Sequence, residues 1–118
     1  MKLINQYTYE IKKSKFIAYY YEISSVEEAK RILELLRKEH KKARHIPYAY
    51  KVNNTASKSD DKEPTNTAGL PLYNLLEKKQ LDNSLIAVVR YFGGIKLGAG
   101  NLLRSYLESA IKAIEKVS

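Results

Sequence analysis

The segment LIAVVRYFGGIKLGAGNLLRSY, residues 85–106, joins an apolar run, a glycine-rich connection and the start of a helical pattern. The run LIAVVRYF has the composition of a central strand that is covered on at least one face. Four of the chain's five glycines follow within eight positions, at Gly93, Gly94, Gly98 and Gly100. Apolar side chains then recur on one helical stripe over about residues 101–117. The segment therefore predicts a buried strand, a glycine loop and a long helix in succession.

Upstream patterns predict the other elements. Alternation of apolar and polar side chains predicts strands over residues 3–11, 15–23 and 45–52, with a hairpin turn between the first two. Ser25 and Glu28 form a capping box, which predicts an amphipathic helix over 26–42. The segment TAGLPLYNLLEKK predicts a further helix, whereas the polar stretch 53–66 has no periodicity and predicts a loop.

The element order β-β-α-β-α-β-α predicts an α+β protein. We expect a two-layer sandwich, in which helices pack on a mixed four-stranded sheet. The chain has 118 residues, which is the size of one compact domain, so we expect residues 1–118 to form a single domain.

Composition narrows the environment and the class of partner. The chain has no cysteine and no run of about 20 apolar residues, and its start does not resemble a signal peptide, so we expect a cytoplasmic protein without disulfides. The net charge is +8, and residues 1–58 carry 13 basic and 6 acidic side chains against 8 and 7 in residues 59–118. Clustered basic side chains favour a polyanionic partner, and a merely solvated face is the alternative. The candidate nucleic-acid-binding residues are Lys12, Lys13, Lys15, Lys41, Lys42 and Arg44.

The glycine loop is a candidate anion site. A glycine loop before a helix can bring backbone N–H groups close to a phosphate, and Arg90, Lys96 and Arg104 flank this one. The candidate anion-binding residues are Arg90, Gly93, Gly94, Lys96, Gly98, Gly100 and Arg104. At Gly98 and Gly100, a need for positive φ or close packing explains the glycines as well as anion binding does. At Gly93 and Gly94, it explains them better than anion binding does. Neither the P-loop nor the dinucleotide signature fits the spacing.

The segment SDDKEPTNTAG, residues 59–69, is an acidic loop. Asp60, Asp61 and Glu63 could gather a magnesium ion, although the spacing is not that of an EF-hand. Acids that cap exposed amides are the favoured interpretation, so we predict no metal and no cofactor. His40 and His45 lie near no activated nucleophile, so no catalytic residue is predicted. Exposed tyrosines beside Lys13 and Lys15 could stack on bases.

Several motifs together resemble those of the Impact/YigZ family. They are SKFIA at 14–18, LRKEHKKARH ending the first helix, AYKV at 49–52, SDDKEPTNTAGLP at 59–71 and RYFGGIKLGAGNLLRSY at 90–106. The resemblance implies a fold similar to the second domain of a small-subunit ribosomal protein and to domain IV of elongation factor G. It also implies a non-enzymatic role near translation, through protein partners in eukaryotic relatives. Bacterial relatives commonly carry a second, ferredoxin-like domain, for which this chain has no residues.

The sequence departs from the family pattern at four places. Glycine is usual where this chain has Lys62 and frequent where it has Asn66, Asn-Cys is common where it has Ile46-Pro47, and glycine is usual at Asn101. The matching positions in the two specific motifs are Asp60, Asp61, Glu63, Pro64, Thr67, Ala68, Gly69, Arg90, Tyr91, Phe92, Gly93, Gly94, Gly98, Gly100, Arg104 and Tyr106.

Three functions follow as hypotheses. The leading one is a module that binds RNA or the ribosome through the basic first half of the chain. The second is a regulator that binds a translation-factor protein. The third is an enzyme that holds a phosphorylated small molecule at the glycine loop and magnesium at Asp60 or Asp61. We expect no membrane partner, and the sequence does not indicate the oligomeric state.

Overall fold

A computed structural model describes residues 1–115 of the chain. The described elements are β1 (Lys2–Ile11), β2 (Ser14–Glu22), α1 (Val26–Glu39), β3 (Tyr48–Val52), β4 (Thr55–Ser59), α2 (Gly69–Lys78), β5 (Ser84–Tyr91) and α3 (Gly98–Glu115). No helix within these residues is long and apolar enough to cross a membrane.

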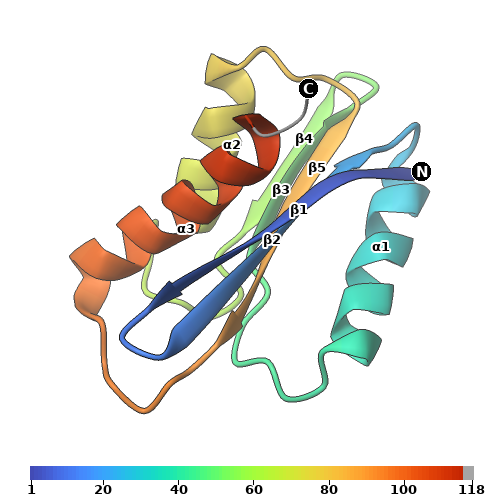
Figure 1. The fold of residues 1–118 in the computed structure, drawn as a ribbon. Helices are drawn as coiled ribbons and strands as arrows, with labels where there is room; N and C mark the ends of the chain where they lie inside the picture. The colour runs from blue at the N-terminus through green and yellow to red at the C-terminus, as the bar shows by residue number, and fades with distance from the viewer. Residues whose placement is uncertain (116–118) are drawn as a thin grey trace.

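The strands form one sheet in the order β1-β2-β5-β3-β4, and every neighbouring pair is antiparallel. Helix α1 covers one face of the sheet, and α2 and α3 cover the other (Figure 1). The prediction of an α+β fold with helices packed on a sheet is confirmed.

The sheet differs from the expected one in three respects. It has five strands instead of four, it is antiparallel instead of mixed, and helices on both faces make three layers instead of two. The additional strand is Thr55–Ser59, within the predicted loop. Its sequence TASKS carries no apolar alternation because this edge strand is mostly exposed, and backbone pairing with β3 holds it in place.

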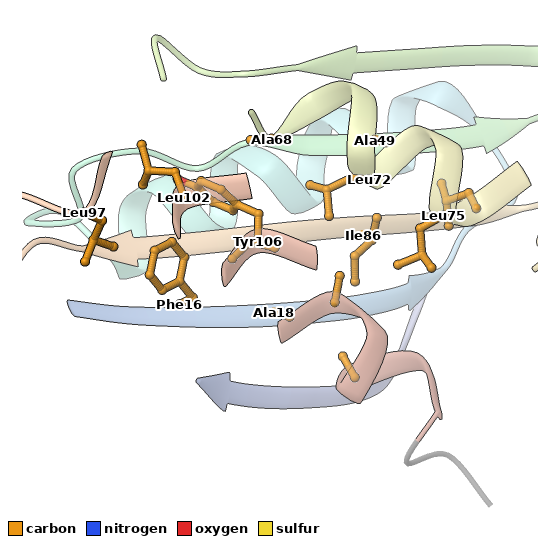
Figure 2. Close-up of a cluster of buried hydrophobic side chains, with 14 residues drawn as sticks. Phe16, Ala18, Ala49, Ala68, Leu72, Leu75, Ile86, Leu97, Leu102 and Tyr106 are labelled. Carbon is orange, nitrogen blue, oxygen red and sulfur yellow. The ribbon is translucent and has the colours of Figure 1, made fainter. Parts of the chain in front are cut away.

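The central strand β5 explains why the sheet needs helices on both faces. Leu85, Ala87 and Val89 belong to the core under α1, while Ile86 and Val88 belong to the core under α2 and α3. Successive side chains of a strand point to opposite faces, so a continuous apolar run requires cover on both. On the α2 and α3 side, the rings of Phe16 and Tyr106 pack edge to face, with their centroids 5.0 Å apart (Figure 2).

The helix boundaries follow local capping. Ser25 Oγ accepts a hydrogen bond from the Glu28 amide at 3.1 Å, and Glu28 accepts one from the Ser24 amide, so α1 begins as predicted. Helix α1 ends at Glu39 and not at residue 42, with His40 as its C-cap. Helix α3 begins at Gly98, three residues before the predicted start, and its predicted end at 117 lies outside the described residues.

The chain leaves β5 in close contact with the β1–β2 hairpin. The Gly93 amide donates a hydrogen bond to Ser14 Oγ at 3.1 Å. A Cβ atom at Gly93 would lie 2.1 Å from the carbonyl carbon of Lys13, which is closer than any side chain tolerates. Glycine at position 93 is therefore required by packing, as the sequence favoured.

Replacing Gly93 with alanine should destabilise the protein by about 1–3 kcal/mol, because the new methyl group overlaps backbone atoms. Gly100→Ala is the matched control. A Cβ atom there meets only the flexible end of Arg104 at 3.8 Å, so alanine in this helical position should stabilise by about 0.5–1 kcal/mol. Urea unfolding of both variants measures the difference, and equal stabilities would contradict the packing argument.

Candidate functional site

Three segments that are far apart in the sequence meet at one end of the sheet. They are the β1–β2 turn, the turn after α1 and the glycine loop after β5 (Figure 1). Lys15 pairs with Tyr91 across β2 and β5, so the hairpin turn lies beside the end of β5. The Arg44 amide donates to the Arg90 carbonyl at 2.8 Å, which attaches the turn after α1 to the same strand end. The first two turns of α3 follow the glycine loop, and Arg104 there lines a surface hollow with Tyr9 and Ile11 near the hairpin turn. We call these four segments together the basic end.

The basic end gathers exposed cations from the predicted nucleic-acid and anion sets. Eight basic side chains there are exposed: Lys12, Lys13, Lys15, Lys41, Lys42, Arg44, Lys96 and Arg104. None of the eight takes part in an ion pair within residues 1–115. At the opposite end, Lys51 pairs with Glu77 and Asp82, and Lys79 pairs with Glu115. The eight cations of the basic end are therefore not neutralised by ion pairs within the described residues.

The hairpin tip holds its two lysines in a strained conformation. Lys12 and Lys13 have φ angles of 48° and 68°, which are the positive values that a type I′ turn requires at both central residues. The β3–β4 hairpin uses Asn53 and Asn54, with φ angles of 52° and 62°, in the equivalent turn. Asparagine tolerates this region, whereas a lysine in it costs about 1–2 kcal/mol. The chain therefore keeps two cations at this tip at the expense of stability.

Phe92 supplies an exposed aromatic ring at the basic end. It is 38% exposed, and the guanidinium of Arg44 lies 4.7 Å from the ring centroid. The ten tyrosines are all buried or half-buried. The exposed tyrosines that the sequence suggested as stacking groups are therefore absent from residues 1–115, and the aromatic side chain in that setting is Phe92.

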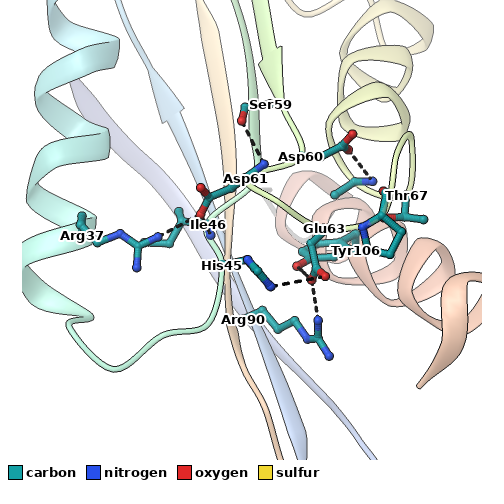
Figure 3. A network of polar contacts seen from close by, with 12 residues as sticks. Arg37, His45, Ile46, Ser59, Asp60, Asp61, Glu63, Thr67, Arg90 and Tyr106 are labelled. Carbon is teal, nitrogen blue, oxygen red and sulfur yellow. Dashed lines mark hydrogen bonds and ion pairs between the residues drawn. The ribbon is translucent and has the colours of Figure 1, made fainter. Parts of the chain in front are cut away.

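Arg90 is buried, and its guanidinium reaches the acidic loop while lying 6.0 Å from the centroid of the Phe92 ring. Its Nη1 donates to Glu63 Oε2 at 2.6 Å, and the hydroxyl of Tyr106 donates to the same oxygen (Figure 3). Burial, followed by the charge of Glu63, raises the pKa of Tyr106, so its hydroxyl remains a neutral donor. Nη1 of Arg90 is thus engaged by Glu63, while the buried Nε has no hydrogen-bond partner within the described residues. An anion in the open part of the loop would depend on Lys96 and Arg104.

The two histidines lie in separate polar contacts. His45 Nε2 lies 3.7 Å from Glu63 Oε1. His40 lies between the hydroxyls of Tyr19 and Tyr91, at 2.8 and 2.6 Å from its two ring nitrogens. Burial, followed by the charge of Glu39, raises the pKa of Tyr19 to about 12, so that hydroxyl stays protonated. His40 therefore connects the end of α1 to β2 and β5.

The carboxylates of the acidic loop bind separate groups. Asp60 accepts hydrogen bonds from the amides of Asn66, Ala68 and Gly69, and so caps the start of α2 (Figure 3). Asp61 accepts from the Ile46 amide at 2.7 Å and pairs with Arg37. No group of three acidic or histidine side chains within residues 1–115 has the geometry to hold a metal ion. Through these contacts the loop connects α1, the segment that leads into β3 and the start of α2.

Two departures from the family pattern fall at strained backbone positions. Lys62 has a φ angle of 71° and Asn66 one of 61°. Glycine, which we expected to be usual at position 62 and frequent at position 66, adopts positive φ without cost, whereas lysine does not. The backbone conformation of this chain thus gives a physical reason for that expectation.

The glycine loop after Gly93 is open. Gly94 and Gly98 have φ angles of 92° and 79°, and no atom lies within 4 Å of a Cβ built on either. Positive φ thus accounts for both glycines. Lys96 is exposed, while Arg104 donates from Nη2 to Asn101 Oδ1 at 2.7 Å. Lys96 and Arg104 remain candidates for binding an anion.

The sequence missed two features of this region. Phe92 looked like the end of a buried strand, and no signal distinguished it from its buried neighbours. The pairing of Glu63 with Arg90 spans 27 positions. The available signal was an arginine at the end of an apolar strand, since a buried charge requires a partner. The loop offered three acids as that partner, Asp60, Asp61 and Glu63, and nothing in the sequence distinguished Glu63.

Replacing Asp60 with asparagine should lower the free energy of unfolding by about 1 kcal/mol near pH 7. Partial burial favours a higher pKa for the Asp60 carboxyl, yet the hydrogen bonds from Asn66, Gly69 and Ala68 outweigh it and hold this pKa below its ordinary value. A lowered pKa means that the stabilisation is present at neutral pH and is lost as the pH falls through the folded-state pKa.

Urea unfolding at about pH 7 and about pH 3 measures this dependence. The gap in stability between the native protein and Asp60→Asn should shrink at the lower pH. A gap that stays constant would mean that the charge of Asp60 plays no part in the cap.

Comparison with known proteins finds relatives that match most of the chain. Residues 12–114 match the family model described as the Impact N-terminal domain. The chain is 37% identical over 110 residues to the IMPACT family member YvyE of Bacillus subtilis, and the match covers 91% of this chain and 51% of that protein. It is 37% identical over 114 residues to the IMPACT family member YigZ of Escherichia coli, and this match covers 92% and 56%. The chain thus spans about half the length of these curated relatives.

Two solved structures share the fold. A crystal structure of a hypothetical protein superposes with a TM-score of 0.92 at 35% identity, covering 97% of this chain and 58% of that one. The structure of the two-domain translational regulator Yih1 superposes with a TM-score of 0.57 at 23% identity, covering 98% and 46%. The match to the family model extends over most of the chain, from the β1–β2 turn into α3. The chain therefore belongs to the Impact N-terminal domain family.

Proposed function

We propose that this chain is a non-enzymatic module that binds RNA or the ribosome through its basic end, in connection with the regulation of translation. The observation that carries the proposal is the convergence of eight exposed, unpaired cations from four segments on one end of the sheet, within residues 1–115. Lysines and arginines that are not neutralised within the protein gain affinity by replacing the counterions of phosphates.

The strained hairpin tip supports the same proposal. Backbone strain persists where surrounding contacts impose it, and it is concentrated at functional positions. A turn of this type favours Asn-Gly, yet this chain has Lys12 and Lys13 there. Retaining two cations at a cost in stability is reasonable if they bind a polyanion.

The connection to translation is the part of the proposal that relatives suggest. One protein with this fold is named as a translational regulator. The enzyme hypothesis has less support, because Asp60 and Asp61, which it would need for magnesium, are engaged by backbone amides and by Arg37. The hypothesis of a protein partner is retained as an alternative outcome of the test below.

Reversing two charges at the basic end should weaken RNA binding and flatten its salt dependence. The test variant is Lys41→Glu with Lys42→Glu. The matched control is Lys30→Glu with Lys78→Glu, which makes the same change in net charge at exposed positions away from the basic end. Fluorescence anisotropy with a structured RNA, measured across salt concentrations, should show a slope that is smaller by about one for each phosphate that the variant no longer neutralises.

The control variant should retain nearly all of the affinity and slope of the native protein. Equal losses in both variants would mean that only the total charge matters, and the proposed interface would be wrong. If no variant binds RNA at low salt, the protein-partner alternative gains, and a nuclease-treated pull-down should then retain a stoichiometric protein.

Exchanging the hairpin tip should separate stability from binding. Lys12→Asn with Lys13→Gly supplies the residues that the turn prefers, so the protein should become more stable by about 1–2 kcal/mol. The same change removes two cations, so RNA affinity should fall. Urea unfolding and anisotropy on one preparation measure both effects, and a variant that is more stable with unchanged affinity would remove the hairpin from the interface.

A further inference from the structure

We infer that the basic end binds unpaired nucleotides in preference to duplex, with a base stacked on the platform formed by Phe92 and Arg44. This inference rests on the proposed function and specifies its ligand. The cations alone would attract any phosphate backbone, paired or unpaired. The aromatic platform adds an interaction that only an exposed base can make.

Phe92 is exposed at a position where the sequence would bury it. It follows β5, whose residues Ser84 to Arg90 are all buried, yet its own side chain is 38% exposed. It is the one aromatic side chain within residues 1–115 that is exposed. An isolated apolar side chain at the surface is ordinary. Here, however, the guanidinium of Arg44, from the turn after α1, lies over the ring, and the next residue, Gly93, contacts the backbone of Lys13.

Arg44 covers part of the Phe92 ring, so the outer face of its guanidinium would be the surface that a base meets there. Its guanidinium lies over the Phe92 ring at 4.7 Å, and both groups are planar surfaces on which bases stack. The backbone around the pair is fixed, because the Arg44 amide bonds the Arg90 carbonyl and the Arg90 amide bonds the His45 carbonyl at 2.9 Å. A base that stacks there would therefore lose little affinity to the ordering of the protein.

The neighbouring cations lie where the flanking phosphates would pass. Gly93 places the loop directly against the backbone of Lys13, on the hairpin side. Lys41 and Lys42 precede Arg44 in the turn on the α1 side. A strand that crosses this end would meet cations before and after the platform. In a duplex the bases face one another and cannot reach Phe92, so only the interactions with phosphate would remain.

An anionic lipid surface is the alternative ligand to RNA, because exposed apolar side chains of a basic loop can insert into a membrane. Phe92 and Ile95, at 38% and 45% exposed, are the large apolar side chains exposed in this loop. A cation covers the Phe92 ring, which favours stacking over insertion into an apolar phase. The charges are also spread over the hairpin and the turn after α1, which suits an extended strand.

The test compares single-stranded and duplex RNA of one sequence, about 12 nucleotides long, which is within the site size of single-strand binding folds. The variants are Phe92→Ala, Phe92→Tyr and the control Leu35→Ala. Leu35 is an apolar side chain on α1 that is 51% exposed. The tyrosine variant retains a stacking ring and keeps the test informative if Phe92→Ala does not fold. Circular dichroism checks folding of each.

The native protein should bind the single strand about tenfold more tightly than the duplex. Phe92→Ala should lose that preference while it keeps its affinity for duplex, whereas Phe92→Tyr and Leu35→Ala should retain it. Equal affinity for both RNAs, or a single-strand preference that survives Phe92→Ala, would overturn the inference and leave the proposed function standing.

Two further results would also decide against the inference. Absence of binding to either RNA at low salt would overturn the proposed function and this inference together. Binding to phosphatidylserine vesicles that is abolished in Phe92→Ala, while RNA binding is unchanged by it, would assign the platform to a lipid surface.

Discussion

The buried pairing of Glu63 with Arg90 is the interaction on which the arrangement of the loops depends. Glu63 comes from the acidic loop, Arg90 from the end of β5, and Tyr106 on α3 donates to the same carboxylate oxygen. Removing one partner of such a pair costs about 3–5 kcal/mol, because the other charge is then buried alone. The pairing therefore fixes the acidic loop and α3 relative to the end of β5.

The basic end depends on that same strand end. Arg90 bonds through its backbone to Arg44 and His45, so the turn after α1 is fixed where β5 finishes. Gly93 then brings the chain against the hairpin backbone at Lys13. The side chain of Arg90 organises the interior, and its backbone positions the surface. The sequence suggested that Arg90 belongs to an anion site. In the structure, Arg90 chiefly holds neighbouring segments in place.

The two hairpin turns differ in how well their residues fit the backbone. The hairpin at Asn53 and Asn54 uses residues that its turn tolerates, whereas the hairpin at Lys12 and Lys13 does not. The lysines of the basic end are unpaired within residues 1–115, while Lys51 and Lys79 at the opposite end are neutralised by acids. The strain at Lys12 and Lys13 supports the binding surface that we propose, because strained backbone is common at functional positions.

The sequence by itself determined the helices, four of the strands, the capping box at Ser25 and the excess of charge in the first half, because these follow from local periodicity and composition. It did not determine β4, because the edge strand TASKS is held by backbone pairing and has no apolar alternation to mark it. The pairing of Arg90 with Glu63 and the exposure of Phe92 could not be predicted from the sequence, because both depend on which segments meet in space. The tertiary structure alone decided that cations from four segments share one end, since an antiparallel sheet brings distant turns together.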